Sequence, residues 1–96
     1  MIKSFGSEGT EDLYHGENSR EARKIPEVIW KAVFRKLDML NAAIQLEDLK
    51  APPGNRLEAL RGNLKGRYSI RINDQYRILF SFKDGNAYEV EIADYH

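Results

Sequence analysis

The chain has 96 residues, no cysteine and a formal net charge of zero, with 42% hydrophobic and 31% charged residues. This length allows one domain with a single core, and the composition excludes a wholly disordered chain. The absence of cysteine excludes disulfide frameworks, thiolate zinc sites and thiol nucleophiles, and two histidines are too few for a histidine metal cage. No apolar run reaches a membrane span and no secretory signal begins the chain, so we expect a cytoplasmic protein without a membrane partner.

The charge is unevenly distributed along the chain. Residues 54–77 carry six basic side chains against two acidic ones, a net of +4, whereas the segments before and after are net acidic. A basic patch within a neutral protein indicates a defined anion site rather than general attraction to polyanions.

The first half of the chain predicts one short strand and two helices. Residues 2–5 alternate apolar and polar side chains, as in a strand, and residues 10–15 form a brief helix that Gly16 can end. Residues 17–24 are polar and are expected to form an exposed loop. The main helix is expected to begin near Pro26, because proline is tolerated in a first turn. Its core stripe is predicted to be Ile29, Trp30, Val33, Phe34, Leu37 and Leu40, with Lys31, Arg35, Lys36 and Asp38 largely facing water.

The second half predicts an antiparallel sheet. One more helical turn at residues 46–49 precedes residues 51–55, where two prolines forbid helix. The apolar period then becomes two, and strands are expected at residues 56–61, in the stretch from Arg67 to Asn73, from Tyr76 to Lys83 and after the Asp84-Gly85 turn. The core face is predicted to be Tyr68, Ile70, Ile72, Tyr76, Ile78, Phe80, Phe82, Tyr88, Val90 and Ile92. Helices followed by strands indicate an α+β fold whose other sheet face is open and basic.

Several side chains in this half could carry chemistry. Guanidinium groups bind phosphate through paired donors, and Arg77 interrupts an otherwise hydrophobic run, whereas Arg67 and Arg71 could equally solubilise an exposed strand. His96 could transfer a proton at neutral pH or could be an exposed chain end. Glu58 could act as a base or neutralise an arginine, and the ring of Tyr95 could stack on a nucleic-acid base.

These motifs together resemble a known family. The segments PPGNRLEAL at residues 52–60, Gly66, SIRIN at 69–73, QYR at 75–77, EI at 91–92 and DYH at 94–96 are similar to the HigB plasmid-maintenance killer proteins of the RelE toxin superfamily. The resemblance covers essentially the whole chain, so residues 1–96 are expected to form one RelE-like toxin domain. It implies an N-terminal strand and two main helices packed on one face of a mainly antiparallel sheet.

The resemblance also implies a function and a set of site residues. It implies a type II toxin that acts as a ribosome-dependent endoribonuclease, cleaving translated messenger RNA in the A site without a metal or other cofactor. Arg77 would be the phosphate clamp, Arg61 a second cation, and Tyr95 with His96 the terminal catalytic pair. Some relatives have histidine where this chain has Glu58, so either Glu58 or His96 would serve as the base. The remaining basic residues expected to bind RNA are Arg56, Lys65, Arg67 and Arg71.

The partners implied are a cognate HigA-type helix-turn-helix antitoxin, the ribosome with its RNA, and the message. Operator DNA would be reached only through the antitoxin. Two alternatives remain open at this point: a noncatalytic inhibitor that occupies the ribosome or its RNA, and a gyrase-directed toxin on the same fold.

Overall fold

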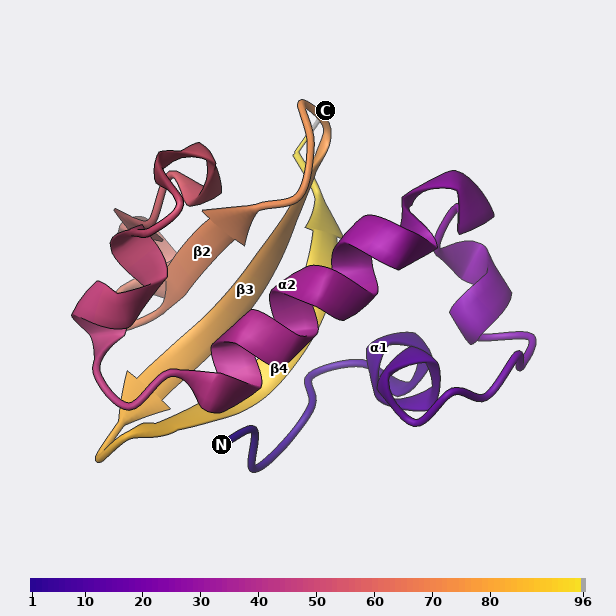
Figure 1. Ribbon diagram of the computed structural model, residues 1–96, viewed down its shortest axis with the longest axis horizontal. Coiled ribbons are helices and arrows are strands. Elements are labelled where there is room, and N and C mark those ends of the chain that lie inside the picture. The colour runs from indigo at the N-terminus through magenta and orange to yellow at the C-terminus, as the bar shows by residue number, and fades with distance from the viewer. Residues whose placement is uncertain (96) are drawn as a thin grey trace.

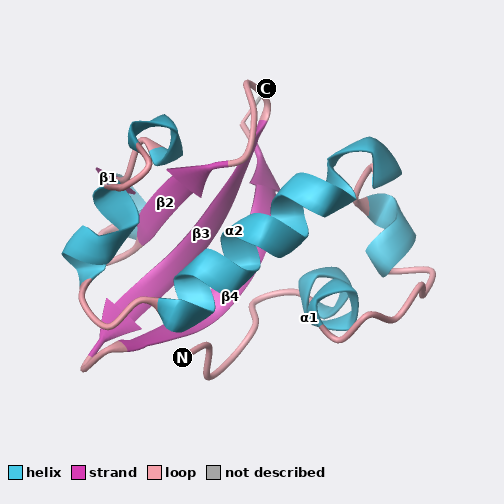
Figure 2. Ribbon diagram, in the orientation of Figure 1, coloured by secondary structure: helices cyan, strands magenta, loops and turns pink. Residues whose placement is uncertain are grey.

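The computed structural model describes residues 1–95 and contains a four-stranded antiparallel sheet with α2 crossing one face (Figure 1). The strands follow one another in sheet order as in sequence, and Figure 2 shows β1 as the short outer strand. They are β1 (Glu58–Ala59), β2 (Tyr68–Arg71), β3 (Tyr76–Lys83) and β4 (Asn86–Asp94). The predicted α+β architecture is therefore confirmed.

Two α-helices and five short 3₁₀ helices make up the rest of the regular structure within residues 1–95. Helix α1 (Glu8–Tyr14) begins at Ser7, whose Oγ accepts a hydrogen bond from the Thr10 amide at 3.3 Å. Helix α2 (Trp30–Ala42) begins four residues after Pro26, which instead precedes a 3₁₀ turn. The 3₁₀ helices are Ala22–Lys24, Glu27–Ile29, Leu46–Lys50, Pro53–Asn55 and Gly62–Leu64. None of the described helices is long and apolar enough to cross a membrane.

The predicted N-terminal strand is present only as two isolated bridges. Ile2 and Phe5 each pair in parallel with β4, at Ala87 and Val90. The rest of the sheet follows the expected hairpins, with β2 and β3 joined through residues 72–75 and β3 and β4 through the Asp84-Gly85 turn. The N-terminal segment thus lies beside the outer strand β4 without extending the sheet.

The core lies between α2 and the sheet. Fully buried side chains of α2, among them Val33, Leu37 and Leu40, pack in one cluster with Ile70, Ile78, Phe80 and Val90 of the strands. Two predictions for α2 were wrong. Phe34 is 38% exposed, and Lys36 is 6% exposed rather than facing water. The buried stripe of α2 consists of residues 33, 36, 37 and 40, so it is rotated slightly around the helix from the predicted stripe. The ammonium of Lys36 donates to an amide oxygen and does not face solvent.

A bulge in β4 overturns one further prediction. Glu89 has a φ of 52°, and the pairing with β3 shifts between Leu79 and Ser81. The extra residue puts Ala87 and Val90 in the core, whereas Tyr88 pairs with Ser81 and does not pack against the core cluster. The strict period of two that predicted Tyr88 as a core residue fails at this bulge.

Candidate active site

A basic cleft lies on the sheet face opposite α2. It has a volume of about 370 Å³, and its lining comes from β1, β2, β3, the loops before β1 and between β2 and β3, and the segment after β4. The lining residues are Arg56, Glu58, Arg71, Asn73, Asp74, Arg77 and Tyr95. Ile70 and Ile78 are buried in the core, so strand alternation directs Arg71 and Arg77 to the opposite face. Three guanidinium groups against two carboxylates suit this cleft to an anion.

Arg77 is held rigidly at the floor of the cleft. The residue is only 9% exposed, its Nε donates to the Ser69 Oγ at 2.8 Å, and its Nη2 donates to the Arg56 carbonyl at 2.6 Å. Its Cζ lies 6.0 Å from the centre of the Tyr95 ring. Two of the N–H groups are thus used to fix the side chain, and the remaining ones can face a ligand oxygen. A cation fixed before its ligand arrives needs no reorganisation to bind phosphate.

The carbonyl that holds Arg77 depends on an unusual backbone conformation. Arg56 has φ 45° and ψ 56°, the left-handed region that costs a non-glycine residue about 1 to 3 kcal/mol. It follows the 3₁₀ turn Pro53–Asn55, and its amide donates to the Pro53 carbonyl at 3.1 Å. In this conformation the Arg56 carbonyl accepts from Arg77 while the residue itself lines the cleft.

Arg71 is the more exchangeable cation of the cleft. It forms an ion pair with Asp74, whose side chain is 97% exposed. An exposed pair of this kind is worth only about 0 to 1 kcal/mol, so an incoming phosphate can replace the carboxylate at little cost. Arg71 also pairs with Arg77 across β2 and β3, which puts two positive charges side by side.

Glu58 lines the basic cleft, whereas Arg61 does not. Glu58, on β1, lines both the basic cleft and a neighbouring hollow formed with Ala59, Leu60 and Arg61. Arg61 therefore faces the neighbouring hollow and not the cleft of Arg77. The proposed second cation lies at the outer margin of the site, next to the carboxylate that is a candidate base.

The other predicted residues are distributed around this cleft. Tyr95 lines it and is 46% exposed, while Lys65 is exposed at the end of the 3₁₀ turn Gly62–Leu64. Arg67 is directed elsewhere, because its Nη2 donates to the Glu89 carbonyl at 2.5 Å. His96, the other member of the predicted terminal pair, lies outside the described residues.

Sequence reasoning missed three side chains that support the site. Ser69 is fully buried and accepts from Arg77, and Asn55 and Lys36 are buried partners of each other beside Arg56. Ser69 and Arg71 are two residues apart on one strand, so their side chains lie on the same face of the sheet. That spacing could have predicted Ser69 beside Arg77. For Asn55 and Lys36 the pattern carried no such signal, because asparagine in a proline-rich turn and lysine on a helix are ordinarily exposed.

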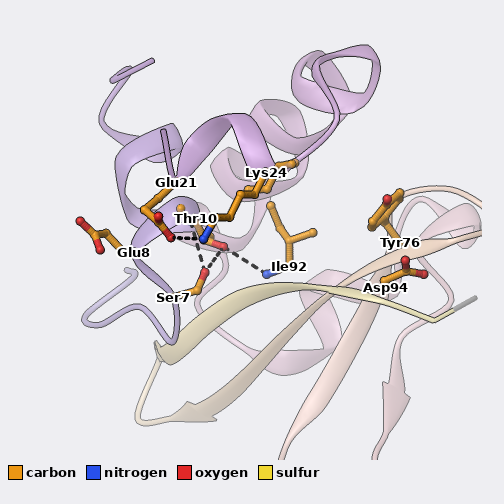
Figure 3. Close-up of a pocket in the computed structure, with 10 residues that line it drawn as sticks. Ser7, Glu8, Thr10, Glu21, Lys24, Tyr76, Ile92 and Asp94 are labelled. Carbon is orange, nitrogen blue, oxygen red and sulfur yellow. Dashed lines mark hydrogen bonds and ion pairs between the residues drawn. The ribbon is translucent and has the colours of Figure 1, made fainter. Parts of the chain in front are cut away.

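A second cavity has the wrong charge for RNA. It lies between α1, the 3₁₀ turn Ala22–Lys24 and the ends of β3 and β4, with a volume of about 320 Å³ (Figure 3). Lys24 pairs with Glu21 at 3.0 Å, and the Thr10 Oγ1 bonds the Ser7 hydroxyl and the Ile92 amide. Glu8 and Asp94 add further carboxylates to its lining. These acidic groups repel a phosphate, so the basic cleft is the better site for a nucleic acid. Among residues 1–95 no group of three or more histidine, aspartate or glutamate side chains is placed to hold a metal ion.

Comparison with solved structures shows the fold. The chain is similar to a mutant of YafQ from Escherichia coli, with a TM-score of 0.66 and 12% identity over 99% of this chain and 92% of that one. It is also similar to a chain of the YoeB–YefM complex from Staphylococcus aureus, with a TM-score of 0.61 and 19% identity over 100% of this chain and 98% of that one. These likenesses confirm the predicted α+β, RelE-like fold.

Sequence relatives identify the family. Toxin HigB-1 of Vibrio cholerae is 48% identical over 87 residues, which cover 91% of this chain and 90% of that protein. Endoribonuclease HigB of Proteus vulgaris is 30% identical over the full length of both chains. A family profile described as the RelE-like toxin of type II toxin–antitoxin system HigB matches residues 3–96. The chain therefore belongs to the HigB family of RelE-like toxins of type II toxin–antitoxin systems.

Proposed function

We propose that this toxin is an endoribonuclease that cuts messenger RNA in the ribosomal A site during translation. The observation that carries the proposal is the fixed guanidinium of Arg77, which shares one cleft with Arg56, Arg71 and Tyr95. The Proteus vulgaris relative is named an endoribonuclease, and it matches this chain over its whole length. A cluster of arginines around an open cleft fits a phosphodiester better than a neutral ligand.

The proposed reaction uses the RNA's own 2′-hydroxyl. A base removes its proton, the 2′-oxygen forms a bond to phosphorus, and the bond from phosphorus to the 5′-oxygen breaks. An acid protonates that leaving oxygen, and the other product is a 2′,3′-cyclic phosphate. Arg77 and Arg71 stabilise the charge that develops on the phosphoryl oxygens, so side chains supply the cationic role and no cofactor is assigned.

Three side chains are candidates for the proton transfers: Glu58, His96 and Tyr95. Glu58 lines the cleft and could remove the proton, although the phosphate's negative charge opposes a second anion there. His96 follows directly after Tyr95, which lines the cleft and whose amide bonds the Gln75 carbonyl at 2.6 Å. We assign proton transfer to Glu58 and His96, and substrate stacking to Tyr95, with a hydroxyl that can also donate to the leaving oxygen.

Outer cations guide RNA to the cleft in this proposal. Arg61 and Lys65 are exposed on the turn beside β1, and Arg67 lies next to them at the start of β2. Such residues contact phosphates at the margin of a site and give binding a steep dependence on salt. The proposal includes ribosomal RNA and message among the partners, together with a HigA-type antitoxin that blocks the toxin. A RelE-fold neighbour, YoeB, has been solved as a toxin–antitoxin complex with YefM.

Mapping message 5′ ends after brief induction tests the proposal. Wild type is expected to produce cuts within translated codons, and Arg77→Ala is expected to lower cleavage by roughly 10²- to 10³-fold, as for the loss of an oxyanion donor. His96→Ala is expected to lower it by roughly 10²- to 10⁴-fold, the usual contribution of a proton-transfer group. Arg20→Ala, at an exposed loop arginine away from the cleft, is the matched control and should cut as wild type does.

Two outcomes contradict the proposal and separate the alternatives. Growth arrest without any new 5′ ends in wild type would indicate a noncatalytic inhibitor of translation. DNA damage in place of message cuts would indicate a gyrase-directed toxin. Equal cutting of naked RNA and of ribosome-bound message by purified protein would contradict the ribosome dependence alone.

A further inference from the structure

A buried polar network joins α2 to the loop that carries Arg56. Asn55 is fully buried, and its Oδ1 accepts a hydrogen bond from the Nζ of Lys36 on α2. Its Nδ2 approaches the Leu49 carbonyl at 3.1 Å, the Ala51 carbonyl at 3.3 Å and the Met39 Sδ at 3.0 Å. The amide of one side chain thus ties the segment from Leu49 to Asn55 to two residues of α2.

The network ends one residue from the carbonyl that holds Arg77. Asn55 closes the 3₁₀ turn Pro53–Asn55, and Arg56 follows in the left-handed conformation with its carbonyl on the Arg77 Nη2. A non-glycine residue keeps such a conformation only where its surroundings fix it. Both the oxygen and the nitrogen of the Asn55 side-chain amide are hydrogen-bonded. Asn55 therefore fixes the backbone position from which the Arg56 carbonyl reaches Arg77.

We propose that Lys36 and Asn55 are positioning residues that act through the Arg56 carbonyl to hold the Arg77 guanidinium in its phosphate-binding orientation. The inference rests on the proposed function, because it assigns a catalytic consequence to that orientation. It makes α2 a contributor to the active site, although none of its side chains lines the cleft.

The character of Lys36 supports a role beyond packing. Among residues 1–95 its ammonium forms no ion pair, and a buried charge without a counter-ion costs stability where an apolar side chain would not. Burial lowers the pKa of Lys36, and the charges of Arg35 and Arg71 lower it further. An apolar residue could fill the same space, but it could not hold the Asn55 amide oxygen.

The test combines a double-mutant cycle with a spectroscopic probe of Arg77. Lys36→Met keeps the length and the apolar stem of the side chain and removes its donor. Lys31→Met is the matched control, since Lys31 is an exposed lysine on the same helix. Each is made in wild type and in Arg77→Ala, and cleavage of ribosome-bound message is measured as a function of ribosome concentration. Urea unfolding confirms that each variant is folded at the assay temperature.

The expected result is a loss of rate that depends on Arg77. In the wild-type background Lys36→Met should lower the saturated cleavage rate by roughly 10- to 100-fold, as for a catalytic group displaced by about 1 Å, and leave half-saturation within about twofold. In the Arg77→Ala background the same substitution should change the rate by less than about twofold. An equal loss in both backgrounds, or no loss in either, would overturn the inference. Lys36→Gln, whose side chain is shorter, is measured in the same way if Lys36→Met fails to fold.

A probe that does not need activity separates this inference from the proposed function. The Arg77 Nε–Hε group donates to Ser69, so its NMR resonance and its exchange with water report the orientation of the guanidinium. Lys36→Met should shift this resonance and speed the exchange, and Lys31→Met should leave both unchanged. If wild type cuts no RNA, the proposed function fails, and the Arg77 resonance alone decides the positioning role. An unchanged resonance in folded Lys36→Met would refute it.

Discussion

Replacing Ser69 with alanine removes a buried partner of the central cation. The Ser69 Oγ accepts from the Arg77 Nε at 2.8 Å, and neither residue is more than 9% exposed. Water cannot replace the lost acceptor at this depth, so the Nε–H group is left unpaired. A hydrogen bond to a charged group contributes about 1.5 to 3 kcal/mol, and we expect Ser69→Ala to lower the free energy of unfolding by that amount.

Two measurements check this expectation. Urea unfolding should give a lower midpoint with an unchanged slope, because the surface exposed on unfolding is nearly the same. The thermal midpoint should fall by about 4 to 8 °C for each kcal/mol in a domain of this size. Cleavage should fall less than in Arg77→Ala, since the Arg56 carbonyl still holds the Nη2.

The control is Ser81→Ala, at a half-buried serine of β3 that does not contact Arg77. It should change stability by less than about 0.5 kcal/mol, as is usual for substitutions away from buried polar networks. If Ser69→Ala were as stable and as active as wild type, Arg77 would not depend on the serine hydroxyl. Among residues 1–95 the Arg56 carbonyl would then be the only hydrogen-bond acceptor that fixes the guanidinium in advance.

Three further predictions follow from the same geometry. Tyr95→Ala should lower the free energy of unfolding in urea by less than about 1 kcal/mol, the value of an exposed contact between an arginine and an aromatic ring. Tyr95→Phe should preserve that contact, so its cleavage rate reveals what the hydroxyl adds. Arg67→Ala should destabilise the fold by about 1 kcal/mol, because its hydrogen bond to the Glu89 carbonyl is lost. The same variant should bind RNA more weakly and with a shallower dependence on salt. A salt dependence equal to that of wild type would show that Arg67 does not contact the RNA. The pKa of Lys36 is lowered in the folded state, so between that pKa and the ordinary one of about 10.4 the unfolded chain binds more protons than the folded chain. Lys36 should therefore make the free energy of unfolding rise with pH in this window. Lys36→Met should abolish that rise in urea unfolding at alkaline pH.

The fold could be predicted largely because local patterns and topology agree. The change of apolar period from helical to two at residue 56 separates helices from strands, and the Asp84-Gly85 turn fixes the last hairpin. The failures arise where tertiary contacts override the local pattern. The bulge at Glu89 moves Tyr88 off the core face. No residue type in the segment predicts that Glu89 adopts the left-handed backbone conformation.

The candidate site could be predicted in part. Arg77, Glu58 and Tyr95 of the predicted catalytic set line one cleft with Arg56 and Arg71, whereas Arg61 lies outside it. Their grouping depends on strand register and on the loop that returns from α2, neither of which a single sequence specifies.

The supporting residues could not be predicted for a different reason. Lys36 occupies a helical position next to Leu37, and it is buried where its ammonium donates to Asn55 of the Pro53–Asn55 turn. A charged residue at the border of an apolar stripe can turn either way, and the choice depends on whether a partner such as Asn55 is present. That partner lies 19 residues away in sequence, beyond any local pattern.

The place of Arg77 on β3 has a consequence for how the toxin can lose activity. β3 is paired on both sides, and Arg77 pairs with Arg71 of β2 and with Ala93 of β4. Residues of a doubly paired strand become accessible only when the sheet as a whole opens, whereas short turns and end segments open locally at much lower free energy. Local opening can displace Arg61 and Lys65 without affecting Arg77. The backbone of the proposed phosphate clamp therefore stays in place until the sheet itself unfolds, whereas the outer cations can be displaced by local opening.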